Sequence, residues 1–183
     1  MPVRILALVG SLRSGSHNRQ LAEAAAKHAP AGTGVEIYEG LAELPFYNED
    51  LDVEGGVPAA VVRLRETAAR ADAFLLFSPE YNGTMPAVLK NAIDWLSRPY
   101  GAGALTGKPV AVVGTAFGQY GGVWAQDEAR KAAGGAVLAD VKLSIPGSVT
   151  RFAELHPAED AEVVTSLTEV LRQVAEQAAP AAA

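Results

Sequence analysis

The sequence predicts a doubly wound α/β domain, in which a parallel sheet of five strands carries helices on both faces. Two observations predict it. Short, almost wholly apolar runs alternate five times with amphipathic stretches, and no repeat or linker divides the chain. Strands that are apolar on both faces are typical of parallel sheets covered by helices on each side. We therefore expect residues 1–183 to form one domain, with a disordered tail after about residue 178.

The apolar runs place the five strands at residues 5–10, 35–38, 73–77, 110–113 and 141–145. Helices are expected between and after them, where apolar residues recur at three- and four-residue spacing. These stretches follow Asn18, Pro58 and Pro86, occupy residues 124–133 with the weakest pattern, and begin again near Pro157. Ligands of such sheets bind outside the carboxyl ends of the strands, so chemistry is expected in the loops that follow the strands.

The composition argues against several classes of protein. The chain has no cysteine, which excludes disulfides, thiolate catalysis and cysteine-ligated metal sites. Its net charge of −6 disfavours nucleic-acid binding, and no run approaches the roughly 20 apolar residues that span a membrane. The three histidines show no metal-ligand spacing. We expect a cytoplasmic protein without a metal, a nucleic-acid partner or a membrane partner.

The loop after the first strand has the composition of a phosphate-binding site. Between Gly10 and Asn18 it carries serines, a second glycine and Arg13, and it leads into a helix. Helix N-termini, hydroxyls and arginine all bind phosphate. Ser16-His17 stands where a nucleotide-hydrolysing loop has lysine and a hydroxyl residue, and the dinucleotide glycine triplet is missing, so a phosphate monoester fits better. In the alternative interpretation, Ser16 and Asn18 only cap the helix and Arg13 is solvated.

The loop after the third strand, residues 78–86, is expected to be stiff. Pro79 fixes one backbone angle, Asn82-Gly83 is a strong turn signal, and Tyr81 offers an aromatic surface. Every connection between a strand and a helix needs a turn, so this loop alone is weak evidence for a site.

Together the two loops resemble the NADPH-dependent FMN reductase family, which includes bacterial quinone, azo-dye and chromate reductases. The resemblance covers roughly residues 3–150. Its motifs are Gly10-Ser11-Leu12-Arg13-x-x-Ser16-x-Asn18, Pro79-Glu80-Tyr81-Asn82, its continuation Pro86-x-x-Leu89-Lys90-Asn91-Ala92-Ile93-Asp94-Trp95, and the looser Pro45-x-Tyr47-Asn48-x-Asp50. The resemblance implies a flavodoxin-like fold with strand order 2-1-3-4-5 and FMN at the point where the order reverses.

The resemblance also implies which residues hold FMN. The first loop would bind the phosphate, the second would line the edge of the isoalloxazine ring, and residues 115–122 would close the other side. The implied cofactor-binding residues are Ser11, Arg13, Ser16, His17, Asn18, Pro79, Glu80, Tyr81, Asn82, Gly83, Thr115, Phe117 and Gly118. Family members often have small residues early in the last loop, a pattern that Thr115 and Phe117 do not follow. Glu80 could be a site carboxylate, but the resemblance favours a structural or main-chain role.

The function implied is an enzyme that passes hydride from NADPH or NADH to FMN, and electrons on to a quinone, free flavin or other small acceptor. No catalytic side chain is expected, since the cofactor carries the chemistry. The alternatives are a non-enzymatic electron carrier and a flavin- or nucleotide-sensing protein on the same fold. Family members are dimers or tetramers, so a homodimer or homotetramer is expected. Asp94, Trp95 and Arg98 are candidates for cross-subunit contacts, although Trp95 could equally belong to the core.

Overall fold

The computed structural model describes residues 2–178, and five parallel strands form its centre. The order across the sheet is β2-β1-β3-β4-β5. The strands are β1 (Val3–Val9), β2 (Thr33–Ile37), β3 (Ala73–Phe77), β4 (Val110–Thr115) and β5 (Val137–Ile145). This architecture and strand order confirm the expected fold. The predicted tail after residue 178 lies outside the described residues.

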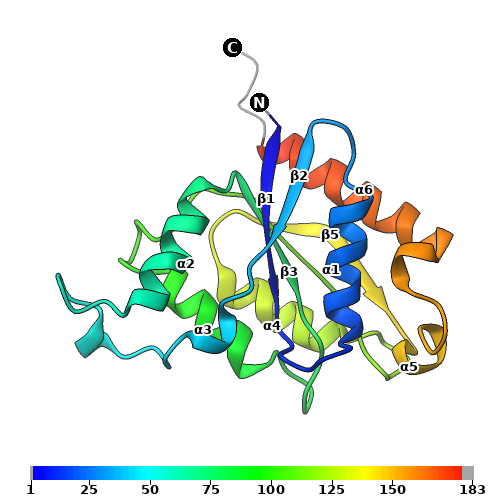
Figure 1. The fold of residues 1–183 in the computed structure, drawn as a ribbon, viewed down its shortest axis with the longest axis horizontal. Helices are drawn as coiled ribbons and strands as arrows, with labels where there is room; N and C mark the ends of the chain where they lie inside the picture. The colour runs from blue at the N-terminus through cyan, green and yellow to red at the C-terminus, as the bar shows by residue number, and fades with distance from the viewer. Residues whose placement is uncertain (1, 179–183) are drawn as a thin grey trace.

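Helices connect the strands and close the fold (Figure 1). The longer helices are α1 (His17–Lys27), α2 (Ala59–Arg70), α3 (Ala87–Leu96), α4 (Val123–Ala133) and α6 (Ala161–Ala178). The short ones are η1 (Leu41–Glu43), η2 (Glu49–Leu51), α5 (Ser148–Arg151) and η3 (Pro157–Glu159).

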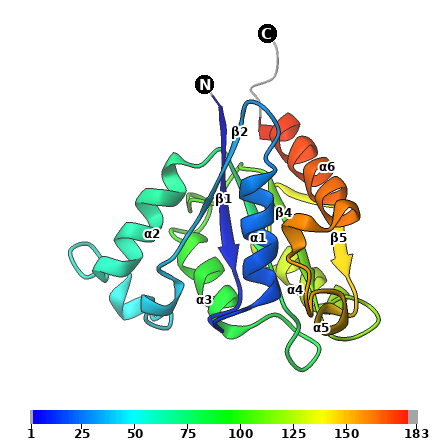
Figure 2. The ribbon, with the colours of Figure 1, turned by 45° about the vertical axis from the view of Figure 1, so that its right-hand side comes forward.

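Two apolar layers sandwich the sheet because successive side chains of a strand point to opposite faces. In β1, Ile5, Ala7 and Val9 pack with α1 and α6, whereas Leu6 and Leu8 pack with α2, α3 and α4. Figure 2 shows α1 and α6 on one side of the strands and α2 and α3 on the other. The wholly apolar run of β1 therefore belongs to a strand covered on both faces, as expected.

The carboxyl ends of the strands meet at one end of the sheet, which is the lower end in Figure 1. β1 lies beside β2 on one side and β3 on the other, so the chain leaves β1 at the point where the strand order reverses. Loops that diverge there leave a crevice between them. This position brings the loops after β1, β3 and β4 together.

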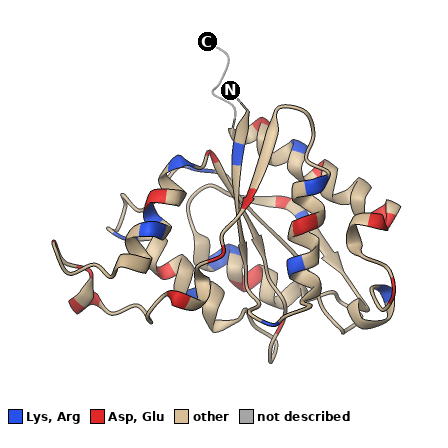
Figure 3. Ribbon diagram, viewed as in Figure 1, with Lys and Arg blue, Asp and Glu red and all other residues tan. Residues whose placement is uncertain are grey.

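Positive and negative residues are interspersed along the ribbon (Figure 3). Each of the five longer helices carries residues of both signs. A nucleic-acid surface needs clustered lysine and arginine, and the described helices offer no such stripe. Within residues 2–178, no helix combines the length and the apolar composition needed to cross a membrane.

Candidate functional site

The loop after β1 forms a cradle at the start of α1. Ser16 is the N-cap residue: its Oγ accepts a hydrogen bond from the N–H of Arg19 at 3.4 Å. The N–H groups of His17 and Asn18 have no acceptor among the described residues. Free N–H groups at a helix N-terminus favour a bound anion. Capping by Ser16 is thus real, and it leaves the neighbouring donors available to a ligand.

Asn18 joins this loop to the end of β4. Its Oδ1 accepts from the N–H of Thr115 at 3.0 Å, and its Nδ2 donates to the Thr115 carbonyl at 2.9 Å. Both residues are buried, and the Thr115 hydroxyl donates to the carbonyl of Ile145 at 2.7 Å. The side chain of Asn18 therefore joins the start of α1 to the end of β4, and that of Thr115 joins the end of β4 to the end of β5.

The loop after β3 ends in a tight two-residue turn. Tyr81 and Thr84 exchange main-chain hydrogen bonds of 3.0 and 3.2 Å. Between them Asn82 and Gly83 have φ angles of 53° and 76°, the left-handed pair typical of a type I′ turn. The Tyr81 hydroxyl lies 3.5 Å from Ser11 Oγ, and its side chain is half-exposed. The hydroxyl of Tyr81 thus reaches the loop after β1.

Glu80 joins the loop after β3 to α4. Its Oε2 accepts from the N–H of Ala125 at 3.2 Å, in the first turn of that helix. A carboxylate at a helix N-terminus is stabilised by the helix dipole. Glu80 thus has the structural role that the resemblance favours.

These three loops enclose one cavity of about 180 Å³. It brings together most of the residues predicted as cofactor ligands: Ser11, Arg13, Ser16, His17, Asn18, Pro79, Glu80, Tyr81, Thr115 and Phe117. Three predicted residues, Asn82, Gly83 and Gly118, do not line it. Two further residues line it: Ala116, which belongs to the 115–122 loop expected to close the site, and Ser148, which was not predicted. Nothing in the local pattern around Ser148 marks it, because it reaches the site through the packing of β5 against β4.

His17 lies at the cavity wall with its ring against Phe152, the ring centroids being 5.6 Å apart. Burial, followed by the positive charge of Arg13, lowers the pKa of His17. The imidazole is therefore biased toward its neutral form when no anion is present. Within the described residues, histidine and acidic side chains nowhere gather in a group that could hold a metal ion.

One face of α3 packs in the interior of the protein. Trp95 has no exposed surface, and its Nε1 donates to the carbonyl of Pro45 at 2.8 Å. Asn91 accepts from the N–H of Tyr47 at 2.8 Å and donates to Pro45 at 3.0 Å. Both side chains anchor the segment after β2 to α3. The suggestion that Trp95 contacts another subunit is wrong, because an enclosed side chain cannot reach a partner. Arg98 remains partly exposed, above the Tyr47 ring.

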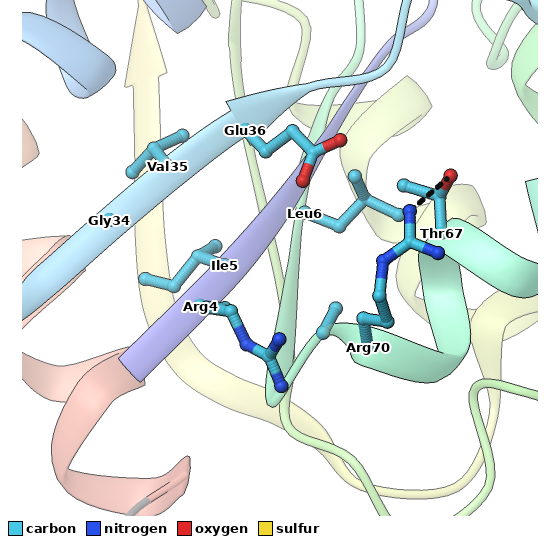
Figure 4. Close-up of a pocket in the computed structure, with 9 residues that line it drawn as sticks. Arg4, Ile5, Leu6, Gly34, Val35, Glu36, Thr67 and Arg70 are labelled. Carbon is cyan, nitrogen blue, oxygen red and sulfur yellow. Dashed lines mark hydrogen bonds between the residues drawn. The ribbon is translucent and has the colours of Figure 1, made fainter. Parts of the chain in front are cut away.

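A second cavity lies away from the carboxyl ends of the strands, between residues 4–6 of β1, residues 34–36 of β2 and the end of α2 (Figure 4). Arg70 donates to Thr67 there at 3.4 Å, with Arg4 and Glu36 nearby on the strands. None of the residues predicted as ligands lines this cavity. The crevice at the carboxyl ends of the strands is therefore the stronger candidate site.

The donor set of that crevice suits a phosphate carried by a larger polar ligand. The lining residues include the start of α1 with its free N–H groups, the serines Ser11 and Ser16, and Arg13, together with the half-exposed Tyr81 and the exposed Phe117. FMN has both a terminal phosphate and a planar ring, so the residues present fit it. Fold and site together define a flavodoxin-like, FMN-binding class of protein.

Comparison with known proteins identifies the family. Residues 3–150 match the family model described as NADPH-dependent FMN reductase, and the chain belongs to this family. A quinone reductase of Pseudomonas putida is 45% identical over 127 residues, which are 69% of this chain and 67% of that protein. An NAD(P)H-dependent FMN reductase of Pseudomonas aeruginosa is 37% identical over 164 residues, 90% of this chain and 78% of that protein.

Among solved structures, the flavoenzyme NAD(P)H:(acceptor) oxidoreductase FerB of Paracoccus denitrificans superposes with a TM-score of 0.77. The two chains are 28% identical, and the match covers 96% of this chain and 98% of FerB. The fold and family expected from the two loop motifs are confirmed.

Proposed function

We propose that this chain is an FMN-dependent NAD(P)H oxidoreductase that holds FMN in the crevice between the loops after β1, β3 and β4. One observation carries the placement. Three loops far apart in the sequence line a single cavity at the point where the strand order reverses, and they contribute Ser11, Arg13, Ser16, His17 and Asn18, then Pro79, Glu80 and Tyr81, then Thr115, Ala116 and Phe117.

Different residues of the cavity bind the phosphate and the ring of FMN. Ser11, Ser16, Arg13 and the N–H groups at the start of α1 hold the phosphate, since they supply hydroxyl, guanidinium and main-chain donors. The main chain of residues 79–81 lines the edge of the ring, and Phe117 closes the rim. Asn18 and Thr115 contribute mainly through their mutual hydrogen bonds, which fix the spacing of the two loops.

Bound FMN supplies the two-electron chemistry, accepting a hydride equivalent from NADPH or NADH and releasing electrons to the acceptor. The protein orients the donor and acceptor and supplies main-chain dipoles around the site. No side chain has to act as a general acid or base. Glu80, the carboxylate in the cavity wall, is already engaged with the N–H of Ala125.

The acceptor class we favour is a quinone. Several relatives carry that name, among them the quinone reductases of Pseudomonas putida and Escherichia coli. A planar acceptor also suits a cavity whose rim bears the rings of Tyr81 and Phe117. A homodimer or homotetramer is part of the proposal, with two partly exposed residues as candidates for contact: Asp94 on α3, and Arg98 just after the end of α3. The cytoplasmic location predicted from the cysteine-free composition stays a prediction.

The experiment is ligand extraction followed by turnover. The purified protein, supplied with FMN and desalted, is denatured, and the released ligand is identified by mass. NADPH and NADH oxidation is then followed with a benzoquinone as acceptor. Recovery of FMN and quinone-dependent oxidation are expected. FMN binding without NAD(P)H oxidation would favour an electron carrier or a flavin sensor, and a different ligand would overturn the placement.

A further inference from the structure

Ser148 is a buried serine in the wall of the cavity, contributed by the segment after β5. Only 6% of its surface is exposed, and it lines the same cavity as the loops after β1 and β4. Its main chain is committed on both sides: the N–H donates to the carbonyl of Ala116 at 3.0 Å, and the carbonyl accepts from the N–H of Phe152 at 3.0 Å. The backbone thus fixes the position of the side chain.

The hydroxyl of Ser148 makes no hydrogen bond to any of the described residues. Other hydroxyls in the wall differ in this respect. Thr115 donates to Ile145, and Ser16 accepts from Arg19. A polar side chain that is nine-tenths buried normally has a partner, because an unmade hydrogen bond there costs free energy. The cavity is the direction from which a partner can come.

The neighbours of Ser148 show which part of a ligand it would meet. Phe152, one helical turn later, places its ring against His17, the first residue of α1. Ala116, which accepts from Ser148, follows Thr115, whose main chain is bridged by Asn18. Both routes lead to the N-terminus of α1 and its free N–H groups. Ser148 is therefore on the anion-binding side of the cavity.

We propose that the Ser148 hydroxyl is a further phosphate ligand, donating a hydrogen bond to the FMN phosphate from the side opposite the loop after β1. This assignment rests on the proposed function, because it requires FMN in this cavity. It completes the donor set: the loop after β4 offers no free hydroxyl at this point, since Thr115 is engaged and Ala116 has none. The segment after β5 supplies the missing donor.

The test compares FMN with riboflavin, which lacks the phosphate. Dissociation constants are measured by fluorescence quenching for the wild-type protein, for Ser148→Ala and for Thr150→Ala. Thr150 is an exposed hydroxyl residue of the same short helix that does not line the cavity. Ser148→Ala should weaken FMN binding by about tenfold, in line with a hydrogen bond to a charged group, and leave riboflavin binding within about twofold. Thr150→Ala should change neither.

The other outcomes separate the assignment of Ser148 from the proposed function. Unchanged FMN affinity in Ser148→Ala overturns the assignment of Ser148 while leaving the proposed function intact. Equal losses for FMN and riboflavin also overturn it, since the hydroxyl would then serve the ribityl chain or the shape of the loop. Failure of the wild-type protein to bind FMN contradicts the proposed function itself. Thermal unfolding of the ligand-free variants, with Ser148→Cys as a near-isosteric second variant, separates a binding defect from a folding defect.

Discussion

Asn18, at the start of α1, is hydrogen-bonded to both main-chain groups of Thr115, at the end of β4. The two distances are 3.0 and 2.9 Å, and the residues are 97 positions apart in sequence. The side-chain amide behaves as a strand neighbour would, presenting one acceptor and one donor to the buried end of the strand. The crevice between these loops thus has a width set by one side chain.

Replacement of Asn18 by alanine should therefore destabilise the protein. The buried N–H and carbonyl of Thr115 would lose their partner, which costs about 2–4 kcal/mol in free energy of unfolding. Urea denaturation measures the change, with Gln177→Ala, an exposed position on α6, as the control. A loss below about 0.5 kcal/mol, the range of ordinary surface substitutions, would mean that the bridge contributes little.

The sequence predicts the strands and the order of elements well because the strands are buried on both faces. β3 is expected at residues 73–77 and runs from Ala73 to Phe77. β5 is expected only from residue 141, yet it begins at Val137. β5 is an edge strand, its residues 137–140 are partly or fully exposed, and its register against β4 shifts between Val137 and Lys142. Apolar runs identify a strand only along the part whose side chains are buried.

Helix α4 shows a second limit of sequence reasoning. Its pattern is weak because two buried positions are polar. Gln126 is fully buried between Gly121 and Ser144, and Arg130 donates to the carbonyl of Val112 at 2.6 Å. An apolar periodicity cannot detect a helix face that is satisfied by hydrogen bonds.

The site could be predicted where its residues are close in sequence and not where packing assembles it. The loops around Arg13 and Tyr81 carry recognisable motifs, and both line the cavity. Ala116 lies between the predicted residues Thr115 and Phe117, whereas Ser148 arrives through the pairing of β4 with β5, which no local pattern encodes. Asp52 illustrates the same point at the surface. It lies in an acidic stretch, yet it is paired with Arg65 at 2.8 Å.

Arg13 should contribute directly to phosphate binding. Arg13 lines the cavity, and the one hydrogen bond of its guanidinium within the described residues goes to the carbonyl of Ser14 at 3.2 Å. Arg13→Ala is expected to weaken FMN binding by about 1.5–3 kcal/mol, the range for hydrogen bonds to charged groups. Calorimetric titration with FMN measures it.

The matched control for this change is Arg19→Ala. Arg19 lies on α1 outside the cavity, with its guanidinium held by Glu39 and Glu23. Its removal should leave FMN affinity nearly unchanged. Equal effects of the two substitutions would indicate a general loss of positive charge, and an unchanged affinity in Arg13→Ala would remove Arg13 from the phosphate ligands.

The lowered pKa of His17 makes stability depend on pH. Burial and Arg13 disfavour the imidazolium in the folded protein, so below the ordinary value of 6.5 the unfolded chain binds more protons. The free energy of unfolding of the ligand-free protein should then fall as the pH drops from 6.5 to the lower folded pKa. His17→Gln should lose this part of the pH dependence. Identical pH profiles for the two proteins would contradict the assignment.

Bound FMN should raise the pKa of His17, whereas burial and Arg13 lower it in the ligand-free protein. A phosphate bound at the start of α1 favours the charged imidazole, so FMN binding at a pH near 6.5 should take up protons at His17. Calorimetry in two buffers of different ionisation enthalpy measures the uptake. The measurement is repeated on His17→Gln, because the phosphate titrates in the same range. The difference between the proteins reports His17, and no difference would place its ring away from the phosphate.

Gly121, in the loop after β4, occupies a position that a larger residue cannot fill. Its φ is +62°, and a Cβ there would lie 2.7 Å from main-chain atoms of Ser144 and Ile145. The obstacle is backbone of β5, which cannot move aside without disturbing its pairing with β4. Gly121→Ala should therefore cost more than the roughly 1–2 kcal/mol of the left-handed conformation alone, and it should also weaken FMN binding by displacing the adjacent loop.

Gly118→Ala is the matched comparison within the same loop. A Cβ at Gly118 would meet no atom within 4 Å, and its φ is not in the left-handed region. Alanine there should leave the free energy of unfolding unchanged or raise it by up to about 1 kcal/mol, because it restricts the unfolded chain. Urea denaturation of both variants measures the contrast. Comparable losses at the two positions would mean that the loop resists any side chain, whereas a tolerated alanine at Gly121 would show that this loop can move away from β5.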